Sequence, residues 1–468
     1  MGVGSYCSKF YKINLISVFV NIEILLGVVG GFSSFILHFA HSFTELYYLF
    51  TFLIISIIGT LVGLEIPLIA RIINISSNFK DTIANVFSFD YIGALLASVI
   101  FPLFLLPYLG IMRTAFVVGF LNILVALINI KYFQREIIKV NKKKMLSALS
   151  IIVMIVGFFA SSSITGFFEE ALYQDQILIT KQSSYQRIVL TRWNDDYRLF
   201  LNGNLQFSSR DENRYHEALV HLPMSISANN YEVLVLGGGD GLAAREILKH
   251  HGVKQIDIID IDPIMTGLAK EAMVLKRINK NSMNNPKVNT INMDAFNYVA
   301  ACKKTYSTVI IDLPDPNDTG LGKLYSKEFY GMLGKVVSPG GAIITQATSP
   351  YFSRKSFWCI ENTMDTVFHN ALPVNIYVPS FGQWGFVISI LSDKNNKTNV
   401  LEDSVLQNRI VLNIAKMRKN LSLRFLDDQT TRQLFNFDSD CNEIPASINT
   451  LDTQNLVKFY EYSLKYWF

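Results

Sequence analysis

The second half of the chain contains a glycine loop with one carboxylate in it. The loop consists of Gly237, Gly238, Gly239, Asp240 and Gly241. They follow the apolar run 233–236 and precede a helical pattern. Glycines let the backbone approach a ligand closely, and the start of a helix offers free N–H groups. A carboxylate gains nothing beside a pyrophosphate, so Asp240 favours a ligand with a positive charge or free hydroxyls. We therefore expect a sulfonium nucleoside or an amine here rather than NAD.

Acidic residues also follow the other strand candidates of this half. Asp260 ends the run 256–260, Asp294 follows 288–292, and Asp312 ends 308–312 with Asp315 close behind. One such acid is usually a turn former or a helix cap. Four consecutive strand ends with acids indicate instead a crevice that holds a ribose diol and a polycation and repels phosphate.

The elements that must position these acids alternate between strands and helices after residue 231. This alternation predicts an α/β Rossmann-like domain over 231–392, a parallel sheet with helices on both faces and ligands at the carboxyl ends of its strands. Runs at 374–378 and 386–391 predict a final hairpin at the sheet edge. Short β-rich runs at 177–180, 187–191 and 197–201, with an Asn202-Gly203 turn, predict a small β lid domain over 173–230. The tail 393–468 is polar at first and then helical around 400–420.

The first half has a different composition. The 468 residues are 50% apolar and 17% charged, and the apolar excess lies before residue 168. We expect 1–168 to be an α-helical membrane bundle with about five spans, since five stretches each approach the ~20 residues that cross a bilayer. These stretches are 13–40, 46–70, 83–109, 114–130 and 145–168. The first is too long for a cleaved signal peptide.

Three acids, Glu23, Glu65 and Asp90, lie within or at the edge of these spans. Intramembrane carboxylates are functional candidates, and a polyamine or cation path through the bundle is one hypothesis. A position near the interface, or hydrogen bonds to neighbouring helices, is an equally weighted alternative.

Two arguments about membrane orientation conflict. The basic residues near 9–12, 71–80 and 131–144 should be cytoplasmic, which places the C-terminal half outside if all five segments cross. A domain that uses a nucleoside should instead face the cytosol. We expect a multi-pass cell-membrane protein with a cytoplasmic catalytic domain, because charge bias is a tendency whereas ligand supply is a requirement. This expectation requires either that the segment 145–168 does not cross the membrane fully, or that basic residues do not mark the cytoplasmic side of this protein.

Charge and cysteine content exclude several other partners. The net charge is +4, without a basic stretch interleaved with aromatic residues, so nucleic acid is not expected as a partner. Cys7, Cys302, Cys359 and Cys441 are widely spaced, which supports neither a zinc site nor a disulfide framework. No bound metal is expected.

In this order and spacing, motifs from 184 to 390 resemble those of the spermidine synthases, the polyamine aminopropyltransferase family. They are Ser184-Tyr185-Gln186, Leu201-Asn202-Gly203 with Gln206, Asp211-Glu212 with Tyr215-His216-Glu217, the glycine loop, Asp294-Ala295, Asp312 to Pro316, and Trp384. The first half resembles the bundle of a membrane-bound bacterial subgroup, in which the opening 1–6 resembles a segment after earlier spans. We therefore expect a shorter version of that bundle.

The resemblance implies transfer of an aminopropyl group from decarboxylated S-adenosylmethionine to putrescine, giving spermidine and methylthioadenosine, with no permanently bound cofactor. Asp312 would be the general base and Asp315 a second acid on the amine or sulfonium side. The residues implied to hold the nucleoside are Gln186, Gly237, Gly239, Asp260, Asp294 and Ala295. Those implied for the amine side are His216 and Asp240 as contacts, with Tyr215, Gln206 and Trp384 along the channel.

Three positions depart from the family pattern: Asn202 replaces the usual Asp, Asp260 replaces a common Glu, and Leu313-Pro314 replace small hydroxyl residues. These changes concern the acceptor more than the reaction class. Two alternatives stay open on the residues: a membrane polyamine transporter or sensor that binds without turnover, and an S-adenosylmethionine-dependent methyltransferase. The expected partners are a small polyamine and the lipid bilayer, and assembly as a homo-oligomer stays open.

Overall fold

The computed structural model describes residues 1–73, 79–173, 175–229, 231–391 and 402–467. The chain divides into two compact units, Met1–Ile177 and Leu178–Phe468. The second unit contains both the small sheet and the large sheet that the sequence predicts as separate domains. The predicted boundaries at 230 and 392, and the asparagine-rich stretch 392–401, lie outside the described residues.

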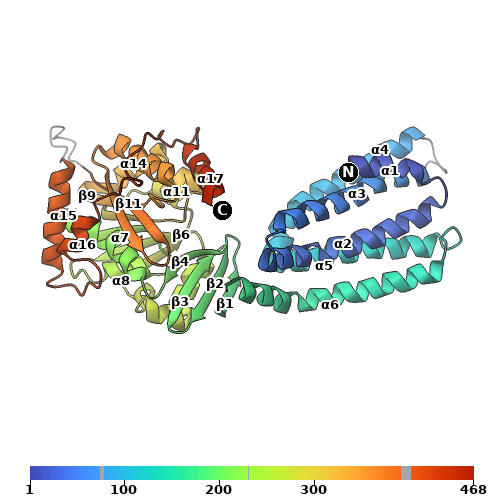
Figure 1. Cartoon of the computed structure of the whole chain (residues 1–468), viewed down its shortest axis with the longest axis horizontal. Coiled ribbons are helices and arrows are strands. Elements are labelled where there is room, and N and C mark those ends of the chain that lie inside the picture. Colours follow the sequence, from blue (N-terminus) through green and yellow to red (C-terminus); the bar gives the residue numbers. More distant parts are fainter. Residues whose placement is uncertain (74–78, 174, 230, 392–401, 468) are drawn as a thin grey trace. The chain divides into compact units, whose positions relative to one another are not determined.

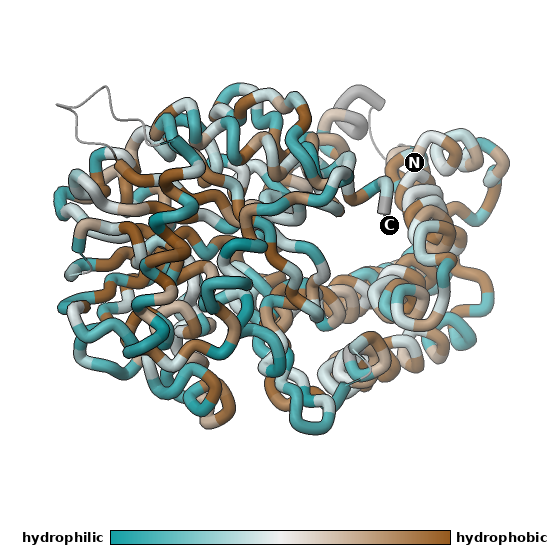
Figure 2. The backbone as a smooth tube through the Cα atoms, turned by 60° about the vertical axis from the view of Figure 1, so that its left-hand side comes forward, coloured by the Kyte–Doolittle hydropathy of each residue, from teal (hydrophilic) through white to brown (hydrophobic). Residues whose placement is uncertain are grey.

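The first unit is helical, and Figure 2 colours long runs of its helices brown for apolar residues. Helix α5 packs against both α2 and α6, and α3 packs against α2. The helices are α1 (Gly2–Cys7), η1 (Ser8–Phe10), α2 (Leu15–Phe43), α3 (Tyr47–Ile73), α4 (Phe79–Ile100), η2 (Phe101–Leu105), α5 (Leu106–Tyr132) and α6 (Val140–Tyr173).

Four helical segments among the described residues are long and apolar enough to cross a membrane. The third, Ala84–Tyr132, has 49 residues and would span roughly 70 Å if straight, more than twice a ~30 Å hydrocarbon core. It contains a π-helical turn at 101–105 and a non-helical residue, Gly110, with φ 74° and ψ 174°. The predicted spans 83–109 and 114–130 are therefore two arms of one kinked segment, and the count of five crossings stays a prediction.

The three acids of this unit differ in exposure. Glu23 on α2 is buried with 6% of its surface exposed, Glu65 on α3 is half-buried, and Asp90 on α4 is exposed within the unit. The Oε1 atom of Glu65 is buried without a hydrogen-bond partner among the described residues. Both the functional and the interfacial interpretations of these acids stay open.

The small sheet of the second unit is antiparallel in the order β1-β2-β3-β4. Its strands are β1 (Gln176–Gln182), β2 (Arg187–Trp193), β3 (Asp196–Leu201) and β4 (Asn204–Ser208). Between β3 and β4, Asn202 and Gly203 have positive φ values of 52° and 84°, as a tight two-residue hairpin turn requires. The predicted lid strands and their turn are confirmed.

The large sheet has the order β10-β11-β9-β8-β5-β6-β7. Strand β5 pairs in parallel with both β6 and β8, which puts the reversal of strand order at its carboxyl end, and β11 runs antiparallel to β9 and β10. The predicted Rossmann-like sheet and edge hairpin are confirmed. The strands are β5 (Glu232–Gly237), β6 (Gln255–Asp260), β7 (Val288–Asn292), β8 (Tyr306–Asp312), β9 (Val337–Gln346), β10 (Leu372–Val378) and β11 (Gly382–Ile390).

Helices cover both faces of this sheet because successive strand residues point to opposite sides (Figure 1). On β5, Val233 and Val235 join one core, whereas Leu234 and Leu236 join the other. The first core includes residues of α7 (Glu212–Ile226), α8 (Leu242–Ile247), α9 (Pro263–Glu271) and α15 (Asp403–Met417). The second includes residues of α11 (Ala295–Ala301), α13 (Lys327–Val336), α14 (Arg354–Phe368) and α17 (Asn455–Trp467). The remaining helices are α10 (Met273–Ile278), η3 (Ser282–Asn284), α12 (Thr319–Gly322), η4 (Lys323–Tyr325) and α16 (Asp428–Gln433).

Candidate active site

The glycine loop follows β5 at the point where the strand order reverses, the place where α/β sheets bind ligands. Gly237 pairs with Asp312 across the sheet, and the N–H of Gly238 donates to the Asp312 carbonyl at 3.2 Å. A Cβ atom at Gly237 would lie 2.0 Å from that carbonyl oxygen, and φ at Gly237 is 83°. Glycine is required here because it lets the end of β5 close onto Asp312.

Asp312 ends β8 and is held by helix α7. The hydroxyl of Tyr215 donates to Oδ1 of Asp312 at 2.8 Å. Burial raises the pKa of Asp312 to about 6. The positive charge of His216 and the hydrogen bond from Tyr215 oppose this rise, whereas the negative charge of Asp240 adds to it. Asp312 is thus mainly ionised at neutral pH, yet its pKa is close enough to neutrality for it to accept a proton.

His216, the next residue of α7, belongs to a buried charge chain. Its Nδ1 lies 2.8 Å from the Glu212 carbonyl and 3.0 Å from Glu212 Oε2. The Glu212 carboxylate also accepts two hydrogen bonds from Arg245, at 2.9 and 2.8 Å. Burial alone would lower the pKa of His216, but the hydrogen bond and charge of Glu212 outweigh it and raise the pKa to about 9. His216 is therefore a cation beside Asp240 and Asp312.

Asp240 and Asp260 lie at the ends of neighbouring strands β5 and β6. Oδ1 of Asp240 accepts from the N–H of Leu242 at 2.8 Å, and Oδ1 of Asp260 accepts from the N–H of Asp262 at 2.8 Å. A Cβ at Gly239 would lie 2.4 Å from Oδ2 of Asp260. Burial raises the pKa of Asp260 to about 6 and also raises that of Asp240. Hydroxyl donors or a cation would relieve this concentration of carboxylates.

Gln186 links the lid to the large sheet. Its Nε2 donates to Oδ2 of Asp262 at 2.9 Å, and the hydroxyl of Ser183 donates to the same oxygen at 2.8 Å. The other oxygen of Asp262 accepts from the N–H of Ile264 at the start of α9, at 2.9 Å. Gln186 is thereby held against Asp262, two residues beyond Asp260 at the end of β6.

Asp294 caps helix α11. Its Oδ1 accepts from the N–H of Asn297 at 3.1 Å, and its Oδ2 pairs with Lys323 at 2.7 Å. Burial opposes ionisation, but the Lys323 hydrogen bond prevails and lowers the pKa of Asp294. Ala295 is buried in the adjoining core. The acid has a helix-capping role, and its contact with a nucleoside stays a prediction.

Asp315 has partners that sequence analysis missed. The hydroxyl of Tyr460 on α17 donates to its Oδ2 at 2.7 Å, and Nε2 of Gln346 lies 3.4 Å from its Oδ1. Burial raises the pKa of Asp315 to about 6, against these two hydrogen bonds. The only signal of the contact between Tyr460 and Asp315 in the sequence is the tyrosine-rich composition of the C-terminus.

Two predicted channel residues lie farther out. Trp384 on β11 packs 5.5 Å from the ring of Phe381, which in turn lies 6.1 Å from the Tyr215 ring. Its Nε1 is buried without a partner among the described residues. Gln206 on β4 donates from Nε2 to the Asn204 carbonyl at 3.2 Å. The structure thus brings Tyr215, His216, Asp240 and Asp312 together, while no described contact joins Gln206 to them.

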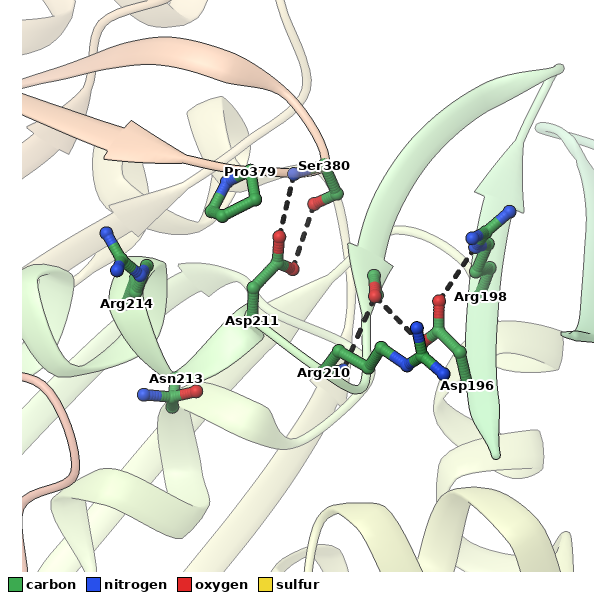
Figure 3. A pocket seen from close by; sticks show the side chains of 9 residues that line it. Asp196, Arg198, Arg210, Asp211, Asn213, Arg214, Pro379 and Ser380 are labelled. Atoms are coloured by element: carbon green, nitrogen blue, oxygen red, sulfur yellow. Dashed lines mark hydrogen bonds and ion pairs between the residues drawn. The ribbon is translucent and has the colours of Figure 1, made fainter. Parts of the chain in front are cut away.

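A cavity of about 430 Å³ opens near the start of α7, beside the lid strands. In Figure 3 the Asp211 carboxylate points to Ser380, from which it accepts two hydrogen bonds, and Arg198 pairs with Asp196 at 2.8 Å. The residues that line the cavity are Asp196, Arg198, Ser208, Arg210, Asp211, Asn213, Arg214, Pro379 and Ser380. None of the predicted site residues is among them, so this cavity is distinct from the acid cluster, which consists of Asp240, Asp260, Asp312 and Asp315.

Comparison with known proteins gives consistent matches. Residues 212–402 match the family model of the spermine/spermidine synthase domain. A polyamine aminopropyltransferase of Leptospira interrogans is 42% identical over 98% of this chain and 89% of its own length. Polyamine aminopropyltransferase 2 of Ralstonia nicotianae is 37% identical over 98% and 88% of the two chains. A crystal structure of a spermidine synthase with the transition-state analogue AdoDATO has the same fold, with a TM-score of 0.50 and 23% identity over 56% of this chain and 86% of that chain.

Proposed function

The chain belongs to the polyamine aminopropyltransferase family, and on that premise we propose that it transfers the aminopropyl group of decarboxylated S-adenosylmethionine to putrescine. The products are spermidine and methylthioadenosine. The observation that carries the proposal is the position of Asp312, a buried carboxylate at the end of β8, beside the glycine loop and hydrogen bonded to Tyr215.

The reaction needs a neutral nitrogen and an electrophilic carbon. The sulfonium already makes its neighbouring carbon electrophilic, so the protein mainly has to orient the two substrates and take a proton. Asp312 accepts a proton from the reacting ammonium group, and the free amine attacks the methylene carbon bound to sulfur. The C–S bond breaks with its electron pair moving to sulfur, which leaves a neutral thioether.

The other acids provide binding in this proposal. Asp260 takes the ribose hydroxyls, and Gln186, Gly237, Gly239, Asp294 and Ala295 surround the rest of the nucleoside. The amine side consists of Asp240, Asp315 and His216, with Tyr215, Gln206 and Trp384 along the path of the alkyl chain. Because free putrescine is a dication, several carboxylates must compensate two positive charges.

We also propose that the first unit anchors the enzyme as a multi-pass membrane protein with the catalytic unit in the cytosol. The length and composition of its four apolar helices support the anchor. A cytosolic position follows from the nucleoside and polyamine that the reaction consumes. C-terminal reporter fusions that are active only outside the cytosol would contradict it.

The test is an assay of methylthioadenosine formation by the purified full chain, with a panel of diamines and triamines. Asp312→Asn keeps the shape of the side chain but removes the base, and we expect turnover to fall by about 10²- to 10⁴-fold. Asp452→Asn, at an exposed position, is the matched control and should behave as wild type. Full turnover by Asp312→Asn would overturn the assignment. Amine binding without product would favour a transporter or sensor, and transfer of a methyl group from intact S-adenosylmethionine would favour a methyltransferase.

A further inference from the structure

The C-terminal helix α17 reaches the acid cluster through one residue. The hydroxyl of Tyr460 lies 2.7 Å from Oδ2 of Asp315, although 145 positions separate the two residues in the sequence. Tyr460 is half-buried, whereas Tyr462 and Tyr466 on the same helix are 74% and 77% exposed. Tyr460 is thus the tyrosine of α17 that faces the site.

The position of α17 does not depend on Tyr460. Leu456 and Val457 are buried at 0% and 6% exposure, and the Val457 side chain lies against Gly322, where a Cβ would be only 2.5 Å away. Lys355 lies over the ring of Phe459 at 4.3 Å. Removal of the Tyr460 hydroxyl therefore leaves the packing of the helix intact.

A buried asparagine fixes the segment before α17. Asn449 is fully buried, and its Nδ2 donates to the carbonyls of Gly322 and Tyr325 at 2.9 and 3.3 Å. Its Oδ1 accepts from the N–H of Leu456 at 3.2 Å. These bonds connect the start of α17 to Tyr325, whose own hydroxyl donates to the Pro314 carbonyl at 3.0 Å. The C-terminal segment and the Asp315 loop are thus held in one network.

The hydrogen-bond capacity of Tyr460 defines what else it can bind. A phenol has one hydrogen to donate, and Tyr460 donates it to Asp315. The phenol oxygen can then only accept. A protonated amine has three donors and no acceptor, so it matches both this oxygen and the Asp315 carboxylate.

We propose that Tyr460 determines acceptor specificity: its oxygen and Asp315 together bind the distal ammonium group of the diamine, and its ring limits the length of the alkyl chain between the two nitrogens. This inference rests on the proposed aminopropyl transfer and extends it to the C-terminal helix. Tyr460 is a substrate-binding residue here, with Asp312 remaining the base at the reacting nitrogen.

The experiment compares the full chain with Tyr460→Phe, and uses Tyr462→Phe on the exposed side of α17 as the control. The acceptors are putrescine and n-butylamine, which has the same carbon chain but lacks the distal ammonium group. A hydrogen bond to a charged group predicts that Tyr460→Phe raises KM for putrescine about tenfold or more. We expect kcat, the KM of the aminopropyl donor and kcat/KM for n-butylamine to change less than about twofold, since these do not involve the distal group.

Tyr460→Ala tests the second part of the proposal. It removes the ring beside Asp315, so the ratio of kcat/KM for cadaverine to that for putrescine should rise above the wild-type ratio. An unchanged ratio would contradict the length limit.

Other results would show that Tyr460 does not have the proposed role, or that the proposed reaction itself is wrong. An unchanged putrescine KM in Tyr460→Phe, or equal losses with putrescine and n-butylamine, would mean that Tyr460 does not bind the distal ammonium group. Calorimetric titration of putrescine into wild type and Tyr460→Phe makes the same comparison without turnover. Wild-type protein that binds putrescine but forms no methylthioadenosine would overturn the proposed function, while tenfold weaker binding to Tyr460→Phe would still support this inference.

Discussion

Tyr215 and Asp312 join helix α7 to the end of strand β8 through a hydrogen bond of 2.8 Å. The bond favours the ionised form of Asp312, because a phenol donates more strongly to a carboxylate than to a carboxylic acid. It therefore works against burial, which raises the pKa of the same group. The balance leaves the proposed base charged near neutral pH and poorly solvated.

Tyr215→Phe should move the pH dependence of the reaction. Asp312 must be ionised to accept a proton, so wild-type kcat/KM should fall as pH drops through about 6. Loss of the Tyr215 hydrogen bond raises the pKa of Asp312, and we expect the acidic limb to move up by about one unit. Tyr377→Phe, an exposed tyrosine on β10, should leave the profile unchanged. A limb that stays in place in Tyr215→Phe would show that another group controls it.

The thermal stability of the ligand-free protein should depend on Asp315 between pH 4 and 6. Burial raises its pKa in the folded state to about 6, above the value of an unfolded aspartate. The folded chain therefore binds this proton more tightly, and ionisation lowers stability as pH rises across that window. Asp315→Asn stays neutral at every pH. The difference between its melting temperature and that of wild type should therefore grow from pH 4 to 6 and stay constant above pH 6. Addition of putrescine should recover part of the difference in wild type alone.

The sequence predicts the scaffold of the site better than its contacts. Strands β5 to β8 and the glycine loop were predictable because apolar runs and glycine at a strand end have local causes. The ion pair of Glu212 with Arg245 and the hydrogen bond of Asp315 with Tyr460 join distant elements, so no local pattern identifies them. Asp294 illustrates a related difficulty: an acid after a strand can cap a helix or bind a ligand, and its sequence neighbours do not distinguish the two.

Prediction from the sequence is limited in a similar way for the helices of the first unit. Apolar length predicted the segments 83–109 and 114–130, but the hydropathy of the chain does not record the break at Gly110 that divides one long helical run between them. A glycine with φ of 74° can end a helix without any change in apolar composition.

Glu212→Gln should destabilise the catalytic unit strongly. Glu212 and Arg245 have side chains only 4% and 9% exposed. Arg245 keeps its ion pair with Glu246 when Glu212 is neutralised, but the buried Glu212 carboxylate that compensates both Arg245 and His216 is lost. Such changes typically cost about 3–5 kcal/mol. Arg210→Gln is a matched control, because the Arg210 and Asp195 side chains are 57% and 79% exposed and a surface pair contributes about 0–1 kcal/mol. Denaturant unfolding of both variants measures the difference, and similar losses in the two would contradict the buried charge chain.

Gly239→Ala tests whether Gly239 and Asp260, which we propose to lie together on the nucleoside side, bind the aminopropyl donor. Gly239 has an ordinary φ, so alanine adds no backbone strain there, but its Cβ would lie 2.4 Å from Oδ2 of Asp260 and must displace that carboxylate. If Asp260 binds the ribose hydroxyls, we expect the KM of the aminopropyl donor to rise about tenfold while the KM of the diamine changes little, because loss of a hydrogen bond to a charged group has that magnitude. Gly252→Ala is the control, since a Cβ at that position meets nothing within 4 Å. A rise in both KM values would place Asp260 between the two substrates, whereas an unchanged donor KM would remove Asp260 from the nucleoside site.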